Sequence, residues 1–170
     1  QNARVPLNLF RFAVPSFKSF QILICDKPTG TWATGVKWTF FNGDGIWLEG
    51  VADEWFAPQT RDAIRKCHAI LREHRDAFTS DNPEPLVPTE RPGVYANLFP
   101  TPTKQVYTLY NSRPQTVRGN LLRVSRRPKA KYTDAWNGKR LSPVADGKDD
   151  LLPVELGPME VGCVVCSWAR

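Results

Sequence analysis

The sequence predicts a parallel α/β segment followed by an all-β sandwich. Three observations lead to this fold class. Strand and helix patterns alternate over residues 1–80, prolines concentrate in residues 81–93, and short strand patterns separated by turns fill residues 94–170. We expect these ranges to form an α/β domain, a Pro-rich extended linker and a β-sandwich domain.

Two short apolar runs predict the strands of the α/β segment. Residues 20–25 read Phe-Gln-Ile-Leu-Ile-Cys, a nearly continuous apolar run that is typical of a strand buried on both faces. Residues 45–49 read Gly-Ile-Trp-Leu-Glu and predict a second, shorter strand. Because a helical pattern connects them, we expect the two strands to lie parallel in one sheet.

A helix is predicted after each of these strands. The first covers residues 32–41, although Gly35 and the β-branched residues weaken its pattern. We expect Trp32 and Trp38 of this helix to pack in the core. The second covers residues 59–78 and has the strongest helical pattern in the chain. Its apolar stripe consists of Ile64, Cys67, Leu71, His74 and Phe78.

Residues 94–170 show a different pattern, in which short strands are separated by turns. Asn137-Gly138 is a strong hairpin signal, which brings residues 139–141 back against residues 132–136. The expected strands are 94–99, 105–110, 121–125, 131–136, 151–156 and 162–168.

The composition is that of a globular protein. Of 170 residues, 41% are hydrophobic and 11% aromatic, which is enough apolar material for a core. No apolar stretch approaches the roughly 20 residues of a membrane-spanning helix. The first residues also lack the pattern of a signal peptide. We therefore expect no membrane span.

The cysteines and histidines predict no metal site and no cofactor. Cys163 and Cys166 have the spacing of half a zinc or redox site, but the sequence contains no second close pair of ligands. Residues three apart in a strand point to opposite faces, so these two thiols should diverge. His68 and His74 are six positions apart on a helix and should also point apart.

The net charge of +6 lies in the second part of the chain. Residues 1–95 hold 11 basic and 11 acidic residues, whereas residues 96–170 hold 12 and 6. Apolar and polar positions alternate in residues 122–127, which predicts that the basic side chains lie on the solvated face of a strand. The densest basic cluster consists of Arg118, Arg123, Arg126, Arg127, Lys129 and Lys131.

This order of elements resembles the C-terminal part of many glycoside hydrolases, in which a (β/α)8 barrel is followed by a Greek-key β-sandwich. Residues 40–48, Phe-Phe-Asn-Gly-Asp-Gly-Ile-Trp-Leu, are similar to the final barrel strand and its approach. Residues 63–78 look like the last barrel helix. Residues 132–141, Tyr-Thr-Asp-Ala-Trp-Asn-Gly-Lys-Arg-Leu, resemble a hairpin of the trailing sandwich.

The resemblance implies that residues 1–80 are the last units of a TIM-type barrel and that residues 94–170 are a Greek-key sandwich with a structural role. A whole barrel needs about 250 residues. A chain of 170 residues would then be part of a larger enzyme, and the N-terminal remainder of the same polypeptide would be its partner. The implied substrate is a carbohydrate, whose glycosidic bonds are hydrolysed by paired carboxylates.

In such a barrel the catalytic groups lie at the C-terminal ends of the strands. Asp26 directly follows the first predicted strand and Glu49 ends the second, so these two residues are the predicted catalytic acids. The alternative is structural, because a carboxylate after a strand is often a helix cap or the partner of a lysine. Asp44 precedes the second strand and is expected at the opposite end of the sheet.

Substrate-binding residues are predicted in the same region. Indole rings stack on the C–H faces of sugars, and Trp55 is the preferred platform in the loop after the second strand. Trp136 lies beside the hairpin turn, and two placements are possible for it. Its side chain is either exposed at the tip of the hairpin or packed between the two domains. The predicted substrate-binding residues are Trp47, Asp53, Glu54 and Trp55.

A second function class stays open beside the glycosidase. A non-catalytic module would bind polysaccharide or another anionic polymer through the basic face of the sandwich. That binding would weaken with salt and on replacement of Arg123 and Arg127 by alanine. Nucleic acid is a less favoured partner, because the sequence contains no recognised nucleic-acid motif.

Overall fold

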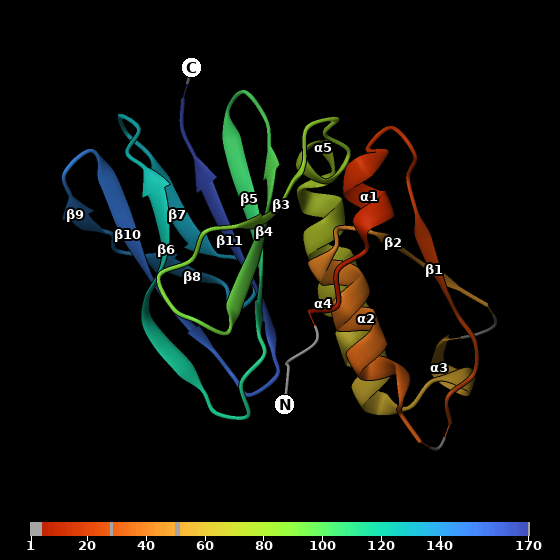
Figure 1. The fold of residues 1–170 in the computed structure, drawn as a ribbon. Coiled ribbons are helices and arrows are strands. Elements are labelled where there is room, and N and C mark those ends of the chain that lie inside the picture. Colours follow the sequence, from red (N-terminus) through yellow and green to blue (C-terminus); the bar gives the residue numbers. More distant parts are fainter. Residues whose placement is uncertain (1–4, 28, 50–51, 170) are drawn as a thin grey trace.

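The structure, a computed structural model, describes residues 5–27, 29–49 and 52–169, with residues 52 and 53 described in the backbone only. Figure 1 shows a first part with helices and a small sheet, and a second part made of antiparallel strands. The first part contains α1 (Leu9–Ala13), β1 (Phe20–Leu23), α2 (Trp32–Phe41), β2 (Gly45–Leu48), α3 (Ala52–Trp55), α4 (Pro58–Glu73) and α5 (Arg75–Phe78). The second part contains β3 (Glu84–Val87), β4 (Val94–Pro100), β5 (Lys104–Asn111), β6 (Val117–Ser125), β7 (Lys131–Asp134), β8 (Lys139–Leu141), β9 (Val144–Asp146), β10 (Asp149–Leu156) and β11 (Val161–Ser167).

The first part is built on β1 and β2, which pair in parallel and are connected by α2. Phe20 lies opposite Gly45, and Leu23 lies opposite Leu48. Leu23 and Ile46 are buried in the core that the sheet shares with α2 and α4. The predicted parallel strand–helix–strand unit is therefore confirmed.

The long helix predicted over residues 59–78 is divided into α4 and α5. His74 stands between them with a φ of −112°, outside the helical range. The N–H groups of Ala77 and Phe78 donate to the carbonyl of His74, which starts a new helical turn. Ala77 and Phe78 are buried, so the apolar stripe continues across the break.

The second part is a sandwich of two antiparallel sheets, as predicted. The larger sheet has the strand order β3-β4-β5-β11-β7-β8, and the smaller has the order β6-β10-β9. The predicted Asn137-Gly138 hairpin joins β7 to β8. The core between the sheets includes Leu109, Leu121, Leu122, Leu152 and Val164.

The six-stranded sheet lies between the three-stranded sheet and the helices, so both of its faces are covered (Figure 1). In β11 six successive residues, Val161 to Cys166, are buried. Cys163 belongs to the core shared with the helices, whereas Cys166 belongs to the core inside the sandwich. The two thiols are free and point to opposite faces, as predicted.

Part of the segment predicted as a linker belongs to the larger sheet. Within residues 81–93, β3 pairs with β4 as an edge strand, the position at which a sheet tolerates proline. The pairing is irregular between Glu84 and Val87. There the N–H of Leu86 donates to Asn97 Oδ1 at 3.0 Å.

A buried polar contact joins the two parts at the end of α2. The carbonyl of Phe41 accepts hydrogen bonds from Asn97 Nδ2 at 2.9 Å and from Thr108 Oγ1 at 2.5 Å. Asn97 and Thr108 are completely buried. The last carbonyls of a helix have no hydrogen-bond donor within the helix. Here β4 and β5 each supply a donor to the Phe41 carbonyl.

Aromatic rings surround this contact. Phe78 and Phe99 have their ring centroids 5.0 Å apart, and Phe40 lies 5.4 Å from Trp136. The ammonium group of Lys66 lies 4.2 Å from the centre of the Trp136 ring. Of the two placements considered for Trp136, the structure has the buried one between the two parts.

The other face of the parallel sheet is open. Phe20 is 60% exposed, Ile22 54% and Trp47 61%. The expectation that residues 20–25 are buried on both faces is therefore wrong for the described part of the chain. The physical reason is that none of the described elements packs across this face, while α2 and α4 cover the opposite one.

Candidate functional site

The carboxyl ends of β1 and β2 bring several predicted site residues together. The N–H of Glu49 donates to the carbonyl of Leu23 at 3.0 Å, which continues the parallel pairing beyond β2. The N–H of Asp26 donates to the carbonyl of Trp55, also at 3.0 Å. Asp26, Glu49 and Trp55 therefore lie at one edge of the sheet.

Asp26 is only 4% exposed and accepts three hydrogen bonds through its carboxylate. Oδ1 accepts from the N–H of Ala57 at 3.0 Å. Oδ2 accepts from Thr60 Oγ1 at 2.6 Å and from the N–H of Trp32 at 3.1 Å. Since Trp32 begins α2 and Ala57 precedes α4, this one carboxylate holds the starts of both helices at the end of β1.

The electrostatics of Asp26 agree with this geometry. Burial opposes its ionisation, but the hydrogen bonds from Thr60, Ala57 and Trp32 outweigh burial and lower the pKa of the carboxyl. Asp26 is thus a stable carboxylate near neutral pH. A catalytic Asp26 would have to exchange these donors for a substrate.

The other predicted site residues are more accessible. Glu49 and Glu54 are exposed, and Trp55 is 38% exposed. Trp47 lies beside Ile22 on the open face of the sheet. Asp53 lies in α3, and its side chain is outside the described part of the chain. The catalytic roles of Asp26 and Glu49, and the substrate-binding roles of Trp47, Asp53, Glu54 and Trp55, stay predictions.

Asp44 lies at the opposite end of the sheet, where it is buried at the start of β2. Its Oδ2 accepts from Asn8 Nδ2 at 2.9 Å, and its Oδ1 lies 3.8 Å from Arg11 Nε. Burial raises the pKa of Asp44 to about 6, although the Asn8 hydrogen bond and the Arg11 charge oppose the rise. Arg11 is also buried and donates from Nη2 to the carbonyl of Phe78 at 2.6 Å.

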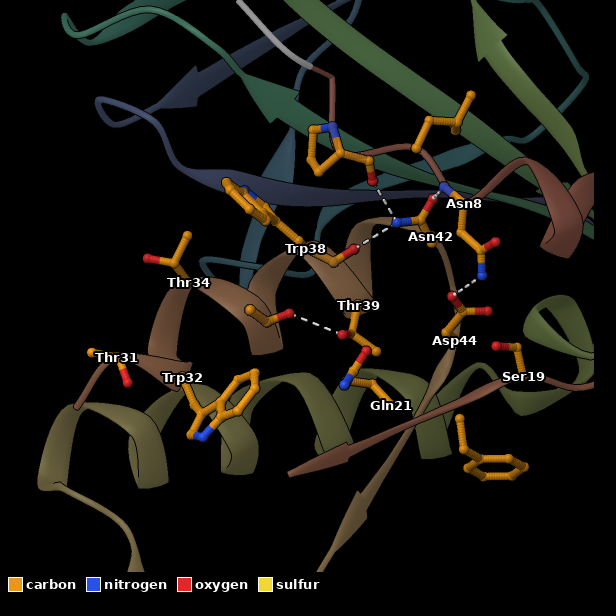
Figure 2. A pocket seen from close by; sticks show the side chains of 14 residues that line it. Asn8, Ser19, Gln21, Thr31, Trp32, Thr34, Trp38, Thr39, Asn42 and Asp44 are labelled. Atoms are coloured by element: carbon orange, nitrogen blue, oxygen red, sulfur yellow. Dashed lines mark hydrogen bonds between the residues drawn. The ribbon is translucent and has the colours of Figure 1, made fainter. Parts of the chain in front are cut away.

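A groove of about 640 Å³ runs along one flank of α2. Its walls are α2, the start of β1 and the segment Pro6–Asn8 (Figure 2). Trp38 is 39% exposed in this groove, so the expectation that it packs in the core is wrong. Trp32 also lines the groove, but it is partly buried against the core of the first part.

Asn42 fastens the wall formed by the N-terminal segment. Its Oδ1 accepts from the N–H of Asn8 at 2.7 Å. Its Nδ2 donates to the carbonyl of Pro6 at 2.7 Å and to that of Trp38 at 2.9 Å (Figure 2). The sequence reasoning did not find the groove, because only the fold brings Pro6 and Asn8 to α2.

The basic face of the sandwich is partly neutralised by acidic residues. Arg123 donates to Glu90 Oε1 at 2.9 Å and to Asp146 Oδ2 at 2.7 Å. Arg126 donates from Nε to Asp150 Oδ1 at 2.8 Å. These ion pairs reduce the free positive charge on this face, and polymer binding through it stays a prediction.

The described residues contain no group of three or more His, Cys, Asp and Glu side chains that could hold a metal ion. His68 lies 3.3 Å from the carbonyl of Ile46, and His74 is buried at the end of α4. Burial lowers the pKa of both histidines. Among the described residues there is also no helix that combines the length and hydrophobicity needed to cross a membrane.

Comparison of the sequence with known protein families and with curated proteins gives no match. The fold, in contrast, is similar to solved glycoside hydrolases. The α-amylase of Geobacillus thermoleovorans matches over 85% of this chain and 35% of its own, with a TM-score of 0.59 and 12% identity. An Anoxybacillus α-amylase matches over 85% and 34%, with a TM-score of 0.54 and 12% identity.

A third similar structure is α-galactosidase I from Mortierella vinacea. It matches over 81% of this chain and 35% of its own, with a TM-score of 0.50 and 8% identity. At these identities the likeness concerns the fold alone. The chain spans about a third of the length of the structures it matches, and its structural neighbours are glycoside hydrolases.

Proposed function

We propose that this chain is the C-terminal portion of a glycoside hydrolase. In this proposal residues 1–80 are the last units of a (β/α)8 barrel, and residues 94–170 are a sandwich that seals the barrel from outside. The complete enzyme hydrolyses glycosidic bonds of a carbohydrate with paired carboxylates. The fold likeness to α-amylases and an α-galactosidase supports the proposal, and these similar chains are about three times as long.

One observation carries the proposal, namely the open apolar face of the parallel sheet. Parallel sheets occur almost only with both faces covered. In this chain Phe20, Ile22 and Trp47 share the face that no described element covers. In a barrel this face would point inward and pack against side chains from the other strands. Further strands of the same barrel would thus complete the burial that the strand sequences predict.

The sandwich has the features of a structural domain in this arrangement. It buries Phe99 and Trp136 against the helices of the first part. It also supplies Asn97 and Thr108 to the end of α2. These contacts lie on the outer side of the helices, away from the carboxyl ends of the strands, where chemistry would occur.

At the carboxyl ends of the strands, where chemistry is expected, Glu49 and Asp26 would have different roles. Glu49 is exposed at the carboxyl end of β2 and is free to meet a substrate. Asp26 holds the starts of α2 and α4, and its own N–H donates to the carbonyl of Trp55 at the end of α3. We therefore favour Glu49 as the acid that acts directly, with Trp55 as the sugar platform.

The first experiment is the intact mass of the native polypeptide under denaturing conditions, followed by assays with aryl glycosides and soluble polysaccharides. We expect a mass well above 19.2 kDa and glycosidase activity in the whole polypeptide. Glu49→Gln should reduce kcat by about 100-fold or more if the residue is a general acid or base. A native mass of 19.2 kDa, or an inactive whole polypeptide with every substrate class, would overturn the proposal.

A further inference from the structure

We propose that one end of the sandwich is a docking surface for an acidic polysaccharide, that is, a glycan with carboxylate or sulfate groups. We call this surface the basic end, and it consists of Arg127, Lys129, Lys131 and Lys148. The inference goes beyond the proposed function, because the basic end holds a polymer without cleaving it. Only the choice of a glycan over another polyanion rests on the proposed function, which brings a carbohydrate to the same polypeptide.

The strands bring these four residues to one place. Strands β6 and β11 run to the same end of the sandwich (Figure 1). Ser125 of β6 lies opposite the first residue of β10, and Ser167 of β11 lies opposite Lys131, the first residue of β7. The N–H of Arg126 donates to the carbonyl of Lys148 at 3.0 Å. The turn between β9 and β10 therefore lies beside the loop between β6 and β7.

Acidic side chains neutralise the neighbouring arginines but not the basic end. Arg123 pairs with Asp146 at 2.7 Å, and Arg126 pairs with Asp150 at 2.8 Å. Residues 126–131 read Arg-Arg-Pro-Lys-Ala-Lys and contain no acidic residue. In the part of the chain that the structure describes, no carboxylate forms an ion pair with the four cations of the basic end. All four are exposed, so their charge is available to a polyanion.

The indole ring of Trp168 orients Arg127. The guanidinium carbon of Arg127 lies 5.1 Å from the centre of this ring, which is a cation–π distance. Trp168 is itself held, because its N–H donates to the carbonyl of Thr103 at 3.0 Å and its side chain packs against the core of the sandwich. A stacked guanidinium still presents N–H groups at its edge, in a fork that fits the paired oxygens of an anionic group.

A strained turn presents Lys129. The N–H of Ala130 donates to the carbonyl of Arg127 at 3.2 Å, which closes a turn over residues 127–130. Lys129 is the third residue of this turn and has a φ of 55°, in the left-handed region that favours glycine. Strained residues of this kind cluster at binding sites, where the side chain matters more than the local strain. We therefore interpret Lys129 as a residue that serves binding through its charge.

The shape of the basic end favours a polymer over a small anion. Lys148 belongs to a turn of the smaller sheet and Lys131 to a strand of the larger one, and packed sheets lie about 10 Å apart. Exposed cations spread over this distance contact several units of a linear polyanion. The Trp168 ring is covered by Arg127 on one face, so that face is not offered to nucleic-acid bases, which bind single-strand proteins by stacking. These features favour an acidic glycan.

The test measures binding of the native polypeptide that contains this chain to fluorescein-labelled polygalacturonate and dextran sulfate, by fluorescence anisotropy in 0.1 M salt. The double variant Arg127→Ala with Lys131→Ala removes two charges from the basic end. Its affinity should fall roughly 20-fold for the polymer that binds, because each cation near an anionic surface contributes about fivefold. Wild-type affinity should decrease steeply with salt. Neutral dextran should not distinguish the two proteins.

A second double variant, Arg113→Ala with Arg118→Ala, controls for net charge. Arg113 lies in the loop between β5 and β6, Arg118 lies near the start of β6, and both are exposed at the opposite end of the sandwich. Nine positions of extended chain separate Arg118 from Arg127, which is about 25–30 Å. This exceeds the screening length of about 10 Å in 0.1 M salt, so affinity should change less than about twofold. Equal losses in the two double variants would overturn the inference.

Lys129→Gly tests the strained turn. Glycine relaxes the left-handed conformation and removes the charge. We expect binding to weaken about fivefold while Tm stays the same or rises. A variant that binds as tightly as the wild type would show that Lys129 has no part in binding, and the inference would be wrong.

The partner and the proposed function are tested apart. An oligothymidylate should bind more weakly than the acidic polysaccharides, and tighter binding would make nucleic acid the partner and overturn the inference. Glycosidase activity on aryl glycosides should be the same in the basic-end variant and the wild type. An active polypeptide whose polymer binding does not respond to the basic-end variant would leave the proposed function intact and overturn only the present inference.

Discussion

The six-stranded antiparallel sheet and the two-stranded parallel sheet lie on opposite sides of α2 and α4, and only the first is covered on both faces (Figure 1). Strand β1 of the parallel sheet and strand β11 of the antiparallel sheet are both nearly continuous apolar runs. In β11 six successive residues are buried, whereas in β1 only Leu23 is. The difference shows that burial depends on the neighbours that a strand finds and not on its own residues.

The largest difference between the two sheets should appear when a phenylalanine is removed from each. Phe99→Ala empties a fully buried site between Phe12 and Phe78 and should destabilise the protein by about 3–5 kcal/mol. Phe20→Ala changes a side chain that is 60% exposed and should cost less than about 1 kcal/mol in this chain. Urea denaturation measures both, and equal losses would mean that the open face is covered in solution.

Removal of the Asp26 carboxylate should have the next largest effect on stability. Asp26→Ala leaves Thr60 and the N–H groups of Ala57 and Trp32 without their acceptor, which should cost about 2–3 kcal/mol. Glu49→Ala, at the same edge but exposed, should change stability by less than about 0.5 kcal/mol. If Asp26→Ala instead unfolds at the same urea concentration as the wild type, its role is chemical and not structural.

Each hydrogen bond at the end of α2 should contribute less to stability than the Asp26 carboxylate does. The Phe41 carbonyl has two donors, so it keeps one when the other is removed. Thr108→Val removes one of two donors to the Phe41 carbonyl and should cost about 1–2 kcal/mol. Thr133→Val, at an exposed position of β7, is the matched control and should have little effect. Thermal unfolding compares the two variants, and an equal shift in Tm would show that the junction contact contributes nothing specific.

The buried carboxyl of Asp44 should make the protein more stable as the pH falls, whereas most carboxylates make a protein less stable at low pH. Its folded-state pKa of about 6 is higher than the ordinary value of 3.8, so the folded protein binds the proton more tightly than the unfolded chain. Between pH 7 and pH 5 this group alone should increase stability by roughly 1 kcal/mol. In Asp44→Asn that contribution disappears, while those of His68 and His74 remain in both proteins. Denaturation at the two pH values tests this, and identical pH slopes for wild type and variant would contradict the assignment.

The smallest effect is expected on the basic face of the sandwich. The Arg123 guanidinium already pairs with Glu90 and Asp146, so Arg123→Ala should leave stability and the retention of the protein on an anionic polymer column almost unchanged. Elution against a salt gradient measures the retention, with Arg127→Ala as the comparison. A strong loss of retention in both variants would favour the polymer-binding module over the glycosidase.

Local sequence signals predicted most of the elements. The alternation in β6, the Asn137-Gly138 turn and the apolar stripe of α4 depend on residues close in the chain, and all appear in the structure. The break at His74 and the edge strand β3 were not predicted. Strand β3 depends on its pairing with β4, which comes from a later part of the chain. Leu86, for example, is held by Asn97 across the sheet.

The candidate site shows the same division. The sequence placed Asp26 and Glu49 after neighbouring strands, and parallel pairing brings them to one edge. The sequence contained no sign that Ala57, Thr60 and Trp32 surround the Asp26 carboxylate, since these donors come from different loops and helices. The groove was missed for a similar reason, because its walls join residues 6–8 to α2.

By itself, the sequence determined the parallel strand–helix–strand unit of the first part, the antiparallel strands of the second part, and the divergence of Cys163 and Cys166. These features follow from side-chain periodicity and backbone preference, which act over a few residues. Only the tertiary structure decided which strand faces are covered, which carboxylate is buried and where Trp136 and Trp38 lie. Burial and hydrogen bonding depend on which distant segments meet, and periodicity identifies an apolar face without identifying what will cover it.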